Sequence, residues 1–352
     1  MSDITLDIFD GDAFKNATLS SWVNINAPFV PGLLGSMPSM FQAEGVNTTD
    51  VLFDEENGSL KMIPSSPRGA APASSINSKG TARKVPTVRL AQEAPLLADQ
   101  VANVRVIGEV GVLKTAQDLV YSRIQGPFGL KQGMSLTLEH IYLGAIDGQV
   151  YDSDGATLLW DFFQIYGVSR PAAVNIPYST TTTDGAVVAT ALTAAKRASV
   201  RAMNGMMLGA SIPVLLCGDN YYDAAWGCKE VVNARKTGAL GNKDALAQIS
   251  NNNAFDSFIF NKVAFVNYRG TDDGTVGIPT DEARFFYAGV PGLFATFFAP
   301  ADTWEFINTK GLPSYLIQRR ERQTESQRTF ELQSNPLAIC TRPKHVQRFT
   351  KS

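Results

Sequence analysis

The chain has 352 residues, of which 44% are hydrophobic and 18% are charged, and its formal net charge is −2. A chain of this length and composition can bury a full core in one large domain or two joined ones, which argues against overall disorder. The low net charge gives no indication of a dedicated nucleic-acid-binding domain.

The first 97 residues predict extended segments. Residues 1 to 50 are rich in Pro, Gly, Ser and Asn between short apolar groups, without a sustained helical period. We therefore expect an extended arm that packs on other surfaces. An alternating run at residues 51 to 54 is followed by a stretch dominated by Gly, Pro, Ser and Ala. A stretch this rich in breakers is unusual inside a compact domain and predicts a long hairpin or a functional loop.

The middle of the chain predicts helices and then a hairpin. Residues 98 to 125 carry apolar side chains at three- and four-residue steps, and a longer amphipathic helix is expected at 130 to 147, ending at Gly148. His140 lies beside the apolar stripe of this helix and is expected to be partly buried. Asp154-Gly155 then supplies the positive φ of a tight turn, which predicts a hairpin between residues 148 and 166.

The second half mixes both kinds of element. We expect a helix at 189 to 207 and another at 222 to 235, with Asp219 or Asn220 as its N-cap. Strands are predicted at residues 212–217, 262–268, 284–290 and 293–298, and on both sides of Asn335-Pro336. Because strands and helices do not form regular βαβ units, the predicted fold class is α+β.

Motifs of catalysis are missing from the sequence. It contains no GxSxG elbow, HExxH helix or GxxxxGK phosphate loop. His345 is expected at the surface near the end of a strand. The cysteines Cys217, Cys228 and Cys340 have no metal-ligand spacing and are predicted to be small buried residues. We predict no catalytic residue, no cofactor and no metal site.

One alternative enzymatic interpretation remains. Asp272 and Asp281 could serve as the acid and base of an α+β hydrolase, although both lie in loops rich in Gly, Thr and Pro, where solvated acids are expected. No signal peptide is expected from the acidic N-terminus. A membrane span at residues 285 to 301 is improbable because glycines and prolines interrupt it.

Charge is distributed in blocks. Residues 1 to 60 contain nine acids against one base, whereas residues 61 to 105 contain seven bases against two acids. A third block, residues 310 to 352, contains nine bases against three acids. Opposite blocks on extended segments suit an assembly in which the arm of one copy meets the loop of another, although they could also only keep these segments soluble.

The segment Arg328-Thr329-Phe330-Glu331-Leu332-Gln333-Ser334-Asn335-Pro336-Leu337 resembles the closing strand and Ser-x-Pro-Leu turn of the lambda-type phage major capsid proteins, the major capsid protein E family. The order of loop, long helix and hairpin upstream is also similar to that family. The resemblance implies a Hong Kong 97-type fold. It assigns residues 1–50 to an N-terminal arm, 51–97 to an extended loop, 98–184 and 326–352 to a peripheral domain with spine helix 130–147, and 185–325 to an axial domain.

The implied function is that of a major capsid protein, without enzymatic activity, which forms hexamers and pentamers of an icosahedral head around double-stranded DNA. Implied partners are other copies, a portal protein, a separate scaffolding protein, a decoration protein and DNA bound without sequence readout, but no membrane. The implied location is the virion shell, assembled in the host cytoplasm. A tail-tube or decoration subunit is the structural alternative, although the predicted helices argue against a tail tube.

Contacts between copies are expected from apolar arm residues and from the charge blocks. Trp22, Phe29 and Phe41 of the arm should be covered only after assembly. The basic C-terminal block could face packaged DNA or the acidic arm of a neighbour, and the low overall charge favours the arm. The predicted contact residues are Trp22, Phe29, Asp54, Glu55, Glu56, Arg68, Lys79, Arg83, Lys84, Arg319, Arg320 and Arg322.

Charge reversal tests this complementarity. Reversing the sign of the acidic or the basic block alone should abolish assembly, and reversing both together should restore it, because opposite charges then face each other again. Particle yield in electron micrographs is the readout. Failure of the double reversal to rescue would show that the blocks do not pair.

Overall fold

The computed structural model describes residues 15–26, 34, 40–56, 80–97, 116–126, 129–178, 186–203, 211–236, 255–268, 270, 271, 274, 276–320 and 327–351. The chain divides into two compact units. Unit 1 comprises Met1–Thr49, Thr87–Tyr142 and Thr296–Ala338, and unit 2 comprises Asp50–Pro86, Leu143–Ala295 and Ile339–Ser352. Both contain helices and strands, which confirms the predicted α+β class.

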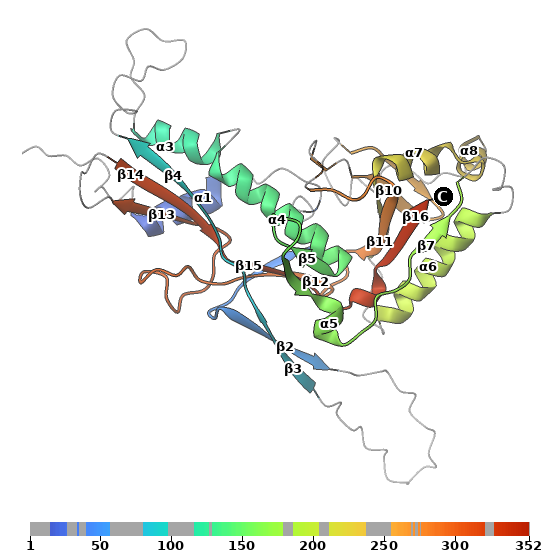
Figure 1. Cartoon of the computed structure of the whole chain (residues 1–352), viewed down its shortest axis with the longest axis horizontal. Helices are drawn as coiled ribbons and strands as arrows, with labels where there is room; N and C mark the ends of the chain where they lie inside the picture. Colours follow the sequence, from blue (N-terminus) through green and yellow to red (C-terminus); the bar gives the residue numbers. More distant parts are fainter. Residues whose placement is uncertain are drawn as a thin grey trace, which may run out of the picture. The chain divides into compact units, whose positions relative to one another are not determined.

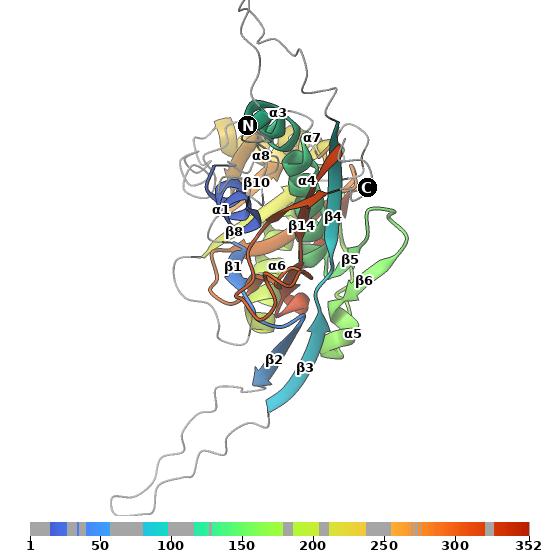
Figure 2. The same ribbon diagram turned by 90° about the vertical axis from the view of Figure 1, so that its left-hand side faces the viewer.

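Unit 1 is built on an antiparallel sheet with the strand order β13-β14-β4. Its strands are β13 (Tyr315–Arg320), β14 (Gln327–Ser334) and β4 (Leu90–Leu97). Helix α1 (Asn16–Asn26) packs against β13, as Figures 1 and 2 show, and Trp22 of α1 meets Tyr121 of α3 (Ala116–Gln125) edge-on at 5.7 Å. A further sheet has the order β1-β12-β15, and the boundary between the units falls within two of its strands, β12 and β15. Its strands are β1 (Gln42–Gly45), β12 (Phe294–Phe298) and β15 (Pro336–Cys340).

Helix α4 (Leu130–Asp147) has the predicted bounds. Leu130, Met134, Leu138, Ile141 and Ala145 form its buried stripe, at the three- and four-residue steps that place side chains on one helix face. The boundary between the two units falls within this helix, after Tyr142. Of the stripe, Ala145 belongs to unit 2 and the other four residues belong to unit 1.

Unit 2 contains a six-stranded mixed sheet with the order β7-β16-β11-β8-β10-β9. All residues of β10 are buried, and so are residues 214 to 217 of β8. These two strands therefore lie in the core as nearly continuous apolar runs. The strands are β7 (Val174–Ile176), β8 (Ile212–Cys217), β9 (Ser257–Phe260), β10 (Val263–Asn267), β11 (Glu282–Ala288) and β16 (Gln347–Lys351). The helices are α5 (Phe162–Tyr166), α6 (Val187–Met203), α7 (Asp219–Gly227), α8 (Lys229–Lys236) and the short 3-10 helix η3 (Pro343–His345).

The hairpin predicted between residues 148 and 166 is confirmed in unit 2, and two strands of the segment predicted as a long hairpin or a functional loop pair there as well. Strands β5 (Gln149–Tyr151) and β6 (Leu158–Asp161) pair around a turn in which Gly155 has a φ of 67° and the Asp154 carboxylate accepts the backbone N–H of Thr157 at 2.8 Å. Strands β2 (Asp50–Glu56) and β3 (Gly80–Pro86) pair antiparallel along all seven residues. The residues between these two strands, 57 to 79, lie outside the described part of the chain.

The arm prediction needs correction. Residues 16 to 26 are helical rather than extended, because contacts with β13 stabilise a helix that the local sequence does not favour. Phe41 is only 8% exposed and stacks on Tyr142 at 4.4 Å, and Trp22 is half-buried, so both are already covered within one chain. Phe29 lies outside the described residues.

The predicted helix at 222 to 235 is two helices, separated at Cys228. Gly218, not Asp219 or Asn220, is the N-cap of α7, and no side chain caps it. A Cβ atom at position 218 would lie 2.3 Å from the carbonyl oxygen of Pro279, so a capping side chain has no room there. Asp219 instead lies in the first turn, where its charge complements the helix dipole. Residues 98–115 and 204–207, predicted to be helical, are outside the described part of the chain.

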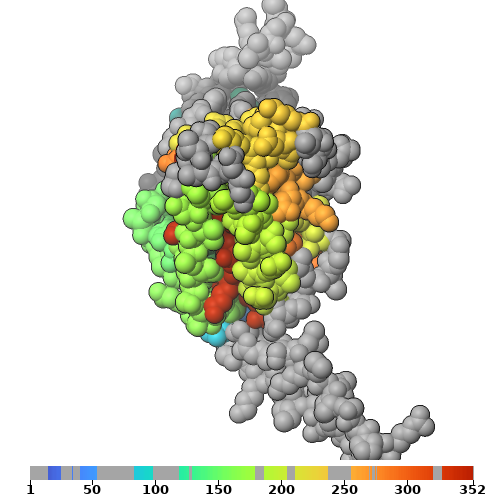
Figure 3. Space-filling model, turned by 90° about the vertical axis from the view of Figure 1, so that its right-hand side faces the viewer, coloured from blue at the N-terminus to red at the C-terminus, as the bar shows by residue number. Residues whose placement is uncertain are grey.

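His345 is fully buried in unit 2, which contradicts the predicted surface position. Figure 3 shows the C-terminal residues, in red, between green atoms of the segment containing α5 and yellow-green atoms of α6, and η3 contacts both helices. The Nδ1 atom of His345 is 2.7 Å from the carbonyl oxygen of Arg342, whereas Nε2 has no partner among the described residues. Burial lowers the pKa of His345 to about 4.

Replacing His345 with Gln should flatten the acid sensitivity of unit 2. Because the folded pKa is about 4 and the reference value is 6.5, the unfolded chain binds the proton first as the pH falls. Stability is therefore fully present above about pH 6.5 and falls by roughly 3 kcal/mol toward pH 4. Denaturant unfolding at these two pH values should show a smaller loss for His345→Gln than for the natural chain, and equal losses would contradict the assignment.

Candidate functional site

Among the described residues, the surroundings of Asp281 are not those of the general acid or base that the hydrolase alternative requires. The Asp281 carboxylate is 59% exposed and accepts hydrogen bonds from Lys351 and Asn220, both at 3.1 Å. The hydrogen bond from Lys351, followed by that from Asn220, lowers the pKa of Asp281. A general acid at neutral pH needs the opposite shift. Asp272 lies outside the described part of the chain, so the hydrolase alternative gains no support.

A cysteine and a histidine that the sequence did not pair lie together in unit 2. The Cys340 Sγ atom is 3.8 Å from Nδ1 of His345, five residues along the chain. Both side chains are fully buried, and burial raises the pKa of Cys340 to about 12. A nucleophilic cysteine needs a lowered pKa and access to substrate. The pair is therefore part of the core, as predicted for the cysteines. No group of three or more His, Cys, Asp or Glu able to hold a metal occurs among the described residues.

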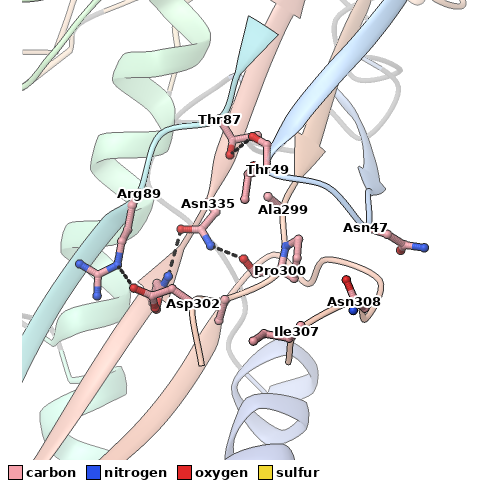
Figure 4. Close-up of a pocket in the computed structure, with 12 residues that line it drawn as sticks. Asn47, Thr49, Thr87, Arg89, Ala299, Pro300, Asp302, Ile307, Asn308 and Asn335 are labelled. Carbon is pink, nitrogen blue, oxygen red and sulfur yellow. Dashed lines mark hydrogen bonds and ion pairs between the residues drawn. The ribbon is translucent and has the colours of Figure 1, made fainter. Parts of the chain in front are cut away.

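A cavity of about 340 Å³ lies in unit 1 beside the start of β4. Figure 4 shows hydrogen bonds among the polar groups around it. Asn335 donates to the backbone carbonyl oxygen of Pro300 at 2.7 Å, and the Thr87 hydroxyl donates to the backbone carbonyl oxygen of Thr49 at 2.8 Å. Its lining residues are Asn47, Thr49, Thr87, Arg89, Ala299, Pro300, Ala301, Asp302, Ile307, Asn308, Gln333 and Asn335. The Asp302 carboxylate in its wall is paired with Arg89 at 3.2 Å, and the lining contains no histidine, cysteine or lysine, so the cavity offers hydrogen bonds and one ion pair.

A cluster of charges centred on Glu331 adjoins this cavity. Glu331 lies in the middle strand, β14, and its side chain is 5% exposed. Arg89 donates to Oε1 at 2.6 Å and Arg319 binds Oε2, so each carboxylate oxygen has a cationic partner. Arg89 also reaches Asp302 at 3.2 Å. Two arginines are needed because a buried carboxylate without compensation would cost several kcal/mol of stability. The cluster joins β13 and β14 to the residue that precedes β4 and to the loop after β12.

The ribbon of β2 and β3 is a second candidate surface, in unit 2. Arg83 donates to the carbonyl oxygen of Ile165, and its guanidinium lies 5.7 Å from the ring centroid of Tyr166. Trp160 donates to the carbonyl oxygen of Pro86 at 3.0 Å. These contacts hold the base of the ribbon against β6 and α5. Leu52 of β2, in contrast, is 70% exposed.

The structure places the predicted contact residues in several settings. Trp22 lies in α1, and Lys84 forms an ion pair with Asp50 of the same chain at 2.9 Å. Arg319 binds Glu331, so both basic residues have partners within the chain. The backbones of Asp54, Glu55 and Glu56 pair with those of residues 82, 81 and 80 of β3, which are uncharged. The remaining predicted residues, Phe29, Arg68, Lys79 and Arg322, and the side chain of Arg320, are outside the described part. Their role between copies stays a prediction.

Sequence reasoning missed the residues that organise unit 1. In the sequence, Glu331 is one of three acids in the basic block of residues 310 to 352, and Arg89 is one of seven bases in the block of residues 61 to 105. The available signal was the position of an acid between the apolar residues Phe330 and Leu332 of a predicted strand. Because this part of the strand is buried on both faces, such an acid needs a cationic partner. Trp304, which is 94% exposed, was also missed because a lone tryptophan in a loop carries no pattern.

The family model described as phage major capsid protein E matches residues 16–351. The chain belongs to this family. The major capsid protein of Pseudomonas phage KPP10, a relative of this family member, is 29% identical over 175 residues, which are 47% of this chain and 48% of that protein. The chain thus spans about half the length of the curated relative that it matches.

Solved structures place this capsid family member in the Hong Kong 97-type fold. An E. coli CFT073 prophage protein assigned as a capsid protein gives a TM-score of 0.57 at 10% identity, covering 96% of this chain and 99% of that chain. The capsid proteins of bacteriophage PhiM1 and cyanophage P-SCSP1u each give 0.51, at 13% and 11% identity. They cover 99% and 93% of this chain, and 93% and 90% of their own. Among the described helices, none has the length and apolar character needed to cross a membrane.

Replacing Glu331 with Gln should destabilise unit 1. The change leaves Arg89 and Arg319 without their shared anion, and we expect a loss of roughly 1 to 3 kcal/mol in the free energy of unfolding, since both arginines are half-exposed. Glu93→Gln is the matched control, because Glu93 lies opposite Glu331 on β4 but is exposed. Denaturant unfolding measures both, and a loss of equal size in the control would contradict a special role for Glu331.

Proposed function

We propose that this chain is the shell subunit of a tailed bacteriophage, and that its copies assemble into the hexamers and pentamers of an icosahedral head around double-stranded DNA. The match of the capsid protein family to residues 16–351 is the observation that carries the proposal. The fold shared with phage capsid proteins supports it.

The surface of the isolated chain supports assembly as well. The ribbon of β2 and β3 has only two strands, and a two-stranded ribbon is marginally stable in water without further packing. Leu52 on this ribbon is 70% exposed, and in unit 1 Trp304 and Ile307 are 94% and 46% exposed. Contacts with neighbouring copies would cover these apolar side chains. Many such contacts, each modest, add up in a closed shell.

The same proposal names the division of the chain and its partners. Residues 1–50 would be the arm, 51–97 the extended loop, 98–184 and 326–352 the peripheral domain, and 185–325 the axial domain. Besides other copies, the partners would be a portal protein, a separate scaffolding protein, a decoration protein and packaged DNA bound without sequence readout. The low overall charge of the chain favours contacts between copies over DNA contacts for the basic C-terminal block, in which Arg319 already binds Glu331 of its own chain. Assembly would take place in the host cytoplasm and the product would be the virion shell.

The alternatives are weaker. Membership of a structural protein family speaks against a hydrolase, and Asp281 has the charge environment of a paired surface acid. A tail-tube or decoration subunit would not be expected to match a capsid protein family along residues 16–351.

Electron microscopy of the purified chain tests the proposal. The chain, alone or expressed with a scaffolding protein from the same phage, should form icosahedral shells or regular hexamers. A chain that stays monomeric under all conditions, with and without the scaffolding protein, would refute it.

A substitution on the ribbon tests the proposed contact at Leu52. Leu52→Asp should lower particle yield strongly, while changing the free energy of unfolding by less than about 0.5 kcal/mol because the side chain is exposed in the isolated chain. Leu52→Met preserves an apolar surface of similar size and should retain particles. Equal yields from the two variants would show that Leu52 does not lie in a contact between copies.

A further inference from the structure

The outer edge of β13 is a potential strand-binding surface. Among the strands that the structure describes, β13 is the edge strand of the order β13-β14-β4 and pairs with β14 alone. On the other side, the backbone N–H and C=O groups of alternate residues point away from the sheet. Such groups can bind an additional strand from another chain unless they are covered.

In this chain α1 covers that edge, and Ser20 shows how. The hydroxyl of Ser20 accepts the backbone N–H of Leu316 at 3.0 Å and donates to the carbonyl oxygen of the same residue at 3.5 Å. One side chain thus supplies the donor and the acceptor that a neighbouring strand would offer to Leu316. Ser20 is fully buried.

Two further side chains extend the contact along the strand. Asn16 accepts the backbone N–H of Gln318 at 2.9 Å, and Asn24 donates to the carbonyl oxygen of Ser314 at 2.8 Å. The helix residues are four apart and the strand residues two apart. Four helical residues rise about 6 Å and two strand residues about 6.6 Å, so the two spacings match.

The local sequence gives α1 little stability of its own. The helix has 11 residues, and its sequence NATLSSWVNIN is dominated by Asn, Ser, Thr and β-branched residues, which are poor helix formers. Helices of this length are marginal in water even when they are rich in alanine. Burial of Leu19 and Val23 and the contacts with β13 therefore hold the helix together. A helix that depends on docking is one that can be released.

We propose that the outer edge of β13 binds β13 of a second copy of this chain, and that α1 guards this edge by occupying it. After release of α1, the two strands would pair antiparallel about a two-fold axis at Leu316, with Ser314 opposite Gln318 of the second copy. The arrangement is self-complementary, as a two-fold contact requires. Residues 315 to 318, Tyr-Leu-Ile-Gln, favour strand pairing. The choice of occupant rests on the proposed function, because a shell brings many copies together.

A pair of charge substitutions on α1 tests the proposal. Val23→Asp places a charge on the fully buried face and should detach the helix, whereas Ser21→Asp places the same charge on the exposed face and should not. At low protein concentration, the amides of Leu316 and Gln318 should exchange with deuterium roughly tenfold faster or more in Val23→Asp than in Ser21→Asp. At high concentration, Val23→Asp should sediment as a dimer and regain protection at both amides.

A third substitution keeps the test independent of general unfolding. Gln318→Pro removes an N–H that bonds α1 rather than β14, and prolines on an edge strand block strand addition. In the Val23→Asp background it should restore the monomer while far-UV circular dichroism stays unchanged. Val23→Asp remaining monomeric at every concentration, or dimerising equally with Gln318→Pro, would overturn the proposal.

The outcome is separable from that of the shell proposal. The natural chain is scored for particles by microscopy, whereas the edge is scored by amide exchange and sedimentation of variants. Shells from the natural chain together with a monomeric Val23→Asp would reject only the strand pairing. A Val23→Asp dimer with no shells from the natural chain would reject only the proposed function.

Discussion

Backbone hydrogen bonding at strand edges is the constraint on which much of this structure depends. A short sheet leaves N–H and C=O groups unpaired along its outer strands, and these groups must find partners in side chains, water or other chains. In unit 1, Asn16, Ser20 and Asn24 of α1 serve the edge of β13. In unit 2, the ribbon of β2 and β3 has two such edges. The edge of β13 is closed from within the chain, whereas for the ribbon we have proposed that neighbouring copies cover the exposed side chain of Leu52.

Buried polar groups show the same need for compensation. Glu331 can occupy the middle strand of a sheet because Arg89 and Arg319 each neutralise one of its oxygens. His345 has no such cation or anion, and it stays buried by remaining neutral, which makes it sensitive to acid. Glu331 is thus stable in the core because it is paired with opposite charges, and His345 because it is uncharged.

The sequence predicted the parts of the fold that depend on local pattern. The bounds of α4 followed from a stripe of apolar residues that ends at a glycine, and the β5–β6 hairpin followed from Asp154-Gly155. Both signals lie within a few residues, so no distant contact was needed to read them. Resemblance of the closing strand to a capsid family pointed to the family that the comparison of residues 16–351 then established.

The tertiary structure alone decided the features that join distant residues. The helical state of residues 16 to 26 depends on backbone groups nearly 300 residues away, and no propensity of that segment predicts it. The charge cluster joins Arg89 to Glu331 across 242 positions, and His345 is buried by α5 and α6 in spite of its basic neighbours. The sequence by itself determined the periodic elements and the family, because their signals are local or cumulative. Only the fold determined which polar side chains meet, because those contacts are set by strand order and packing.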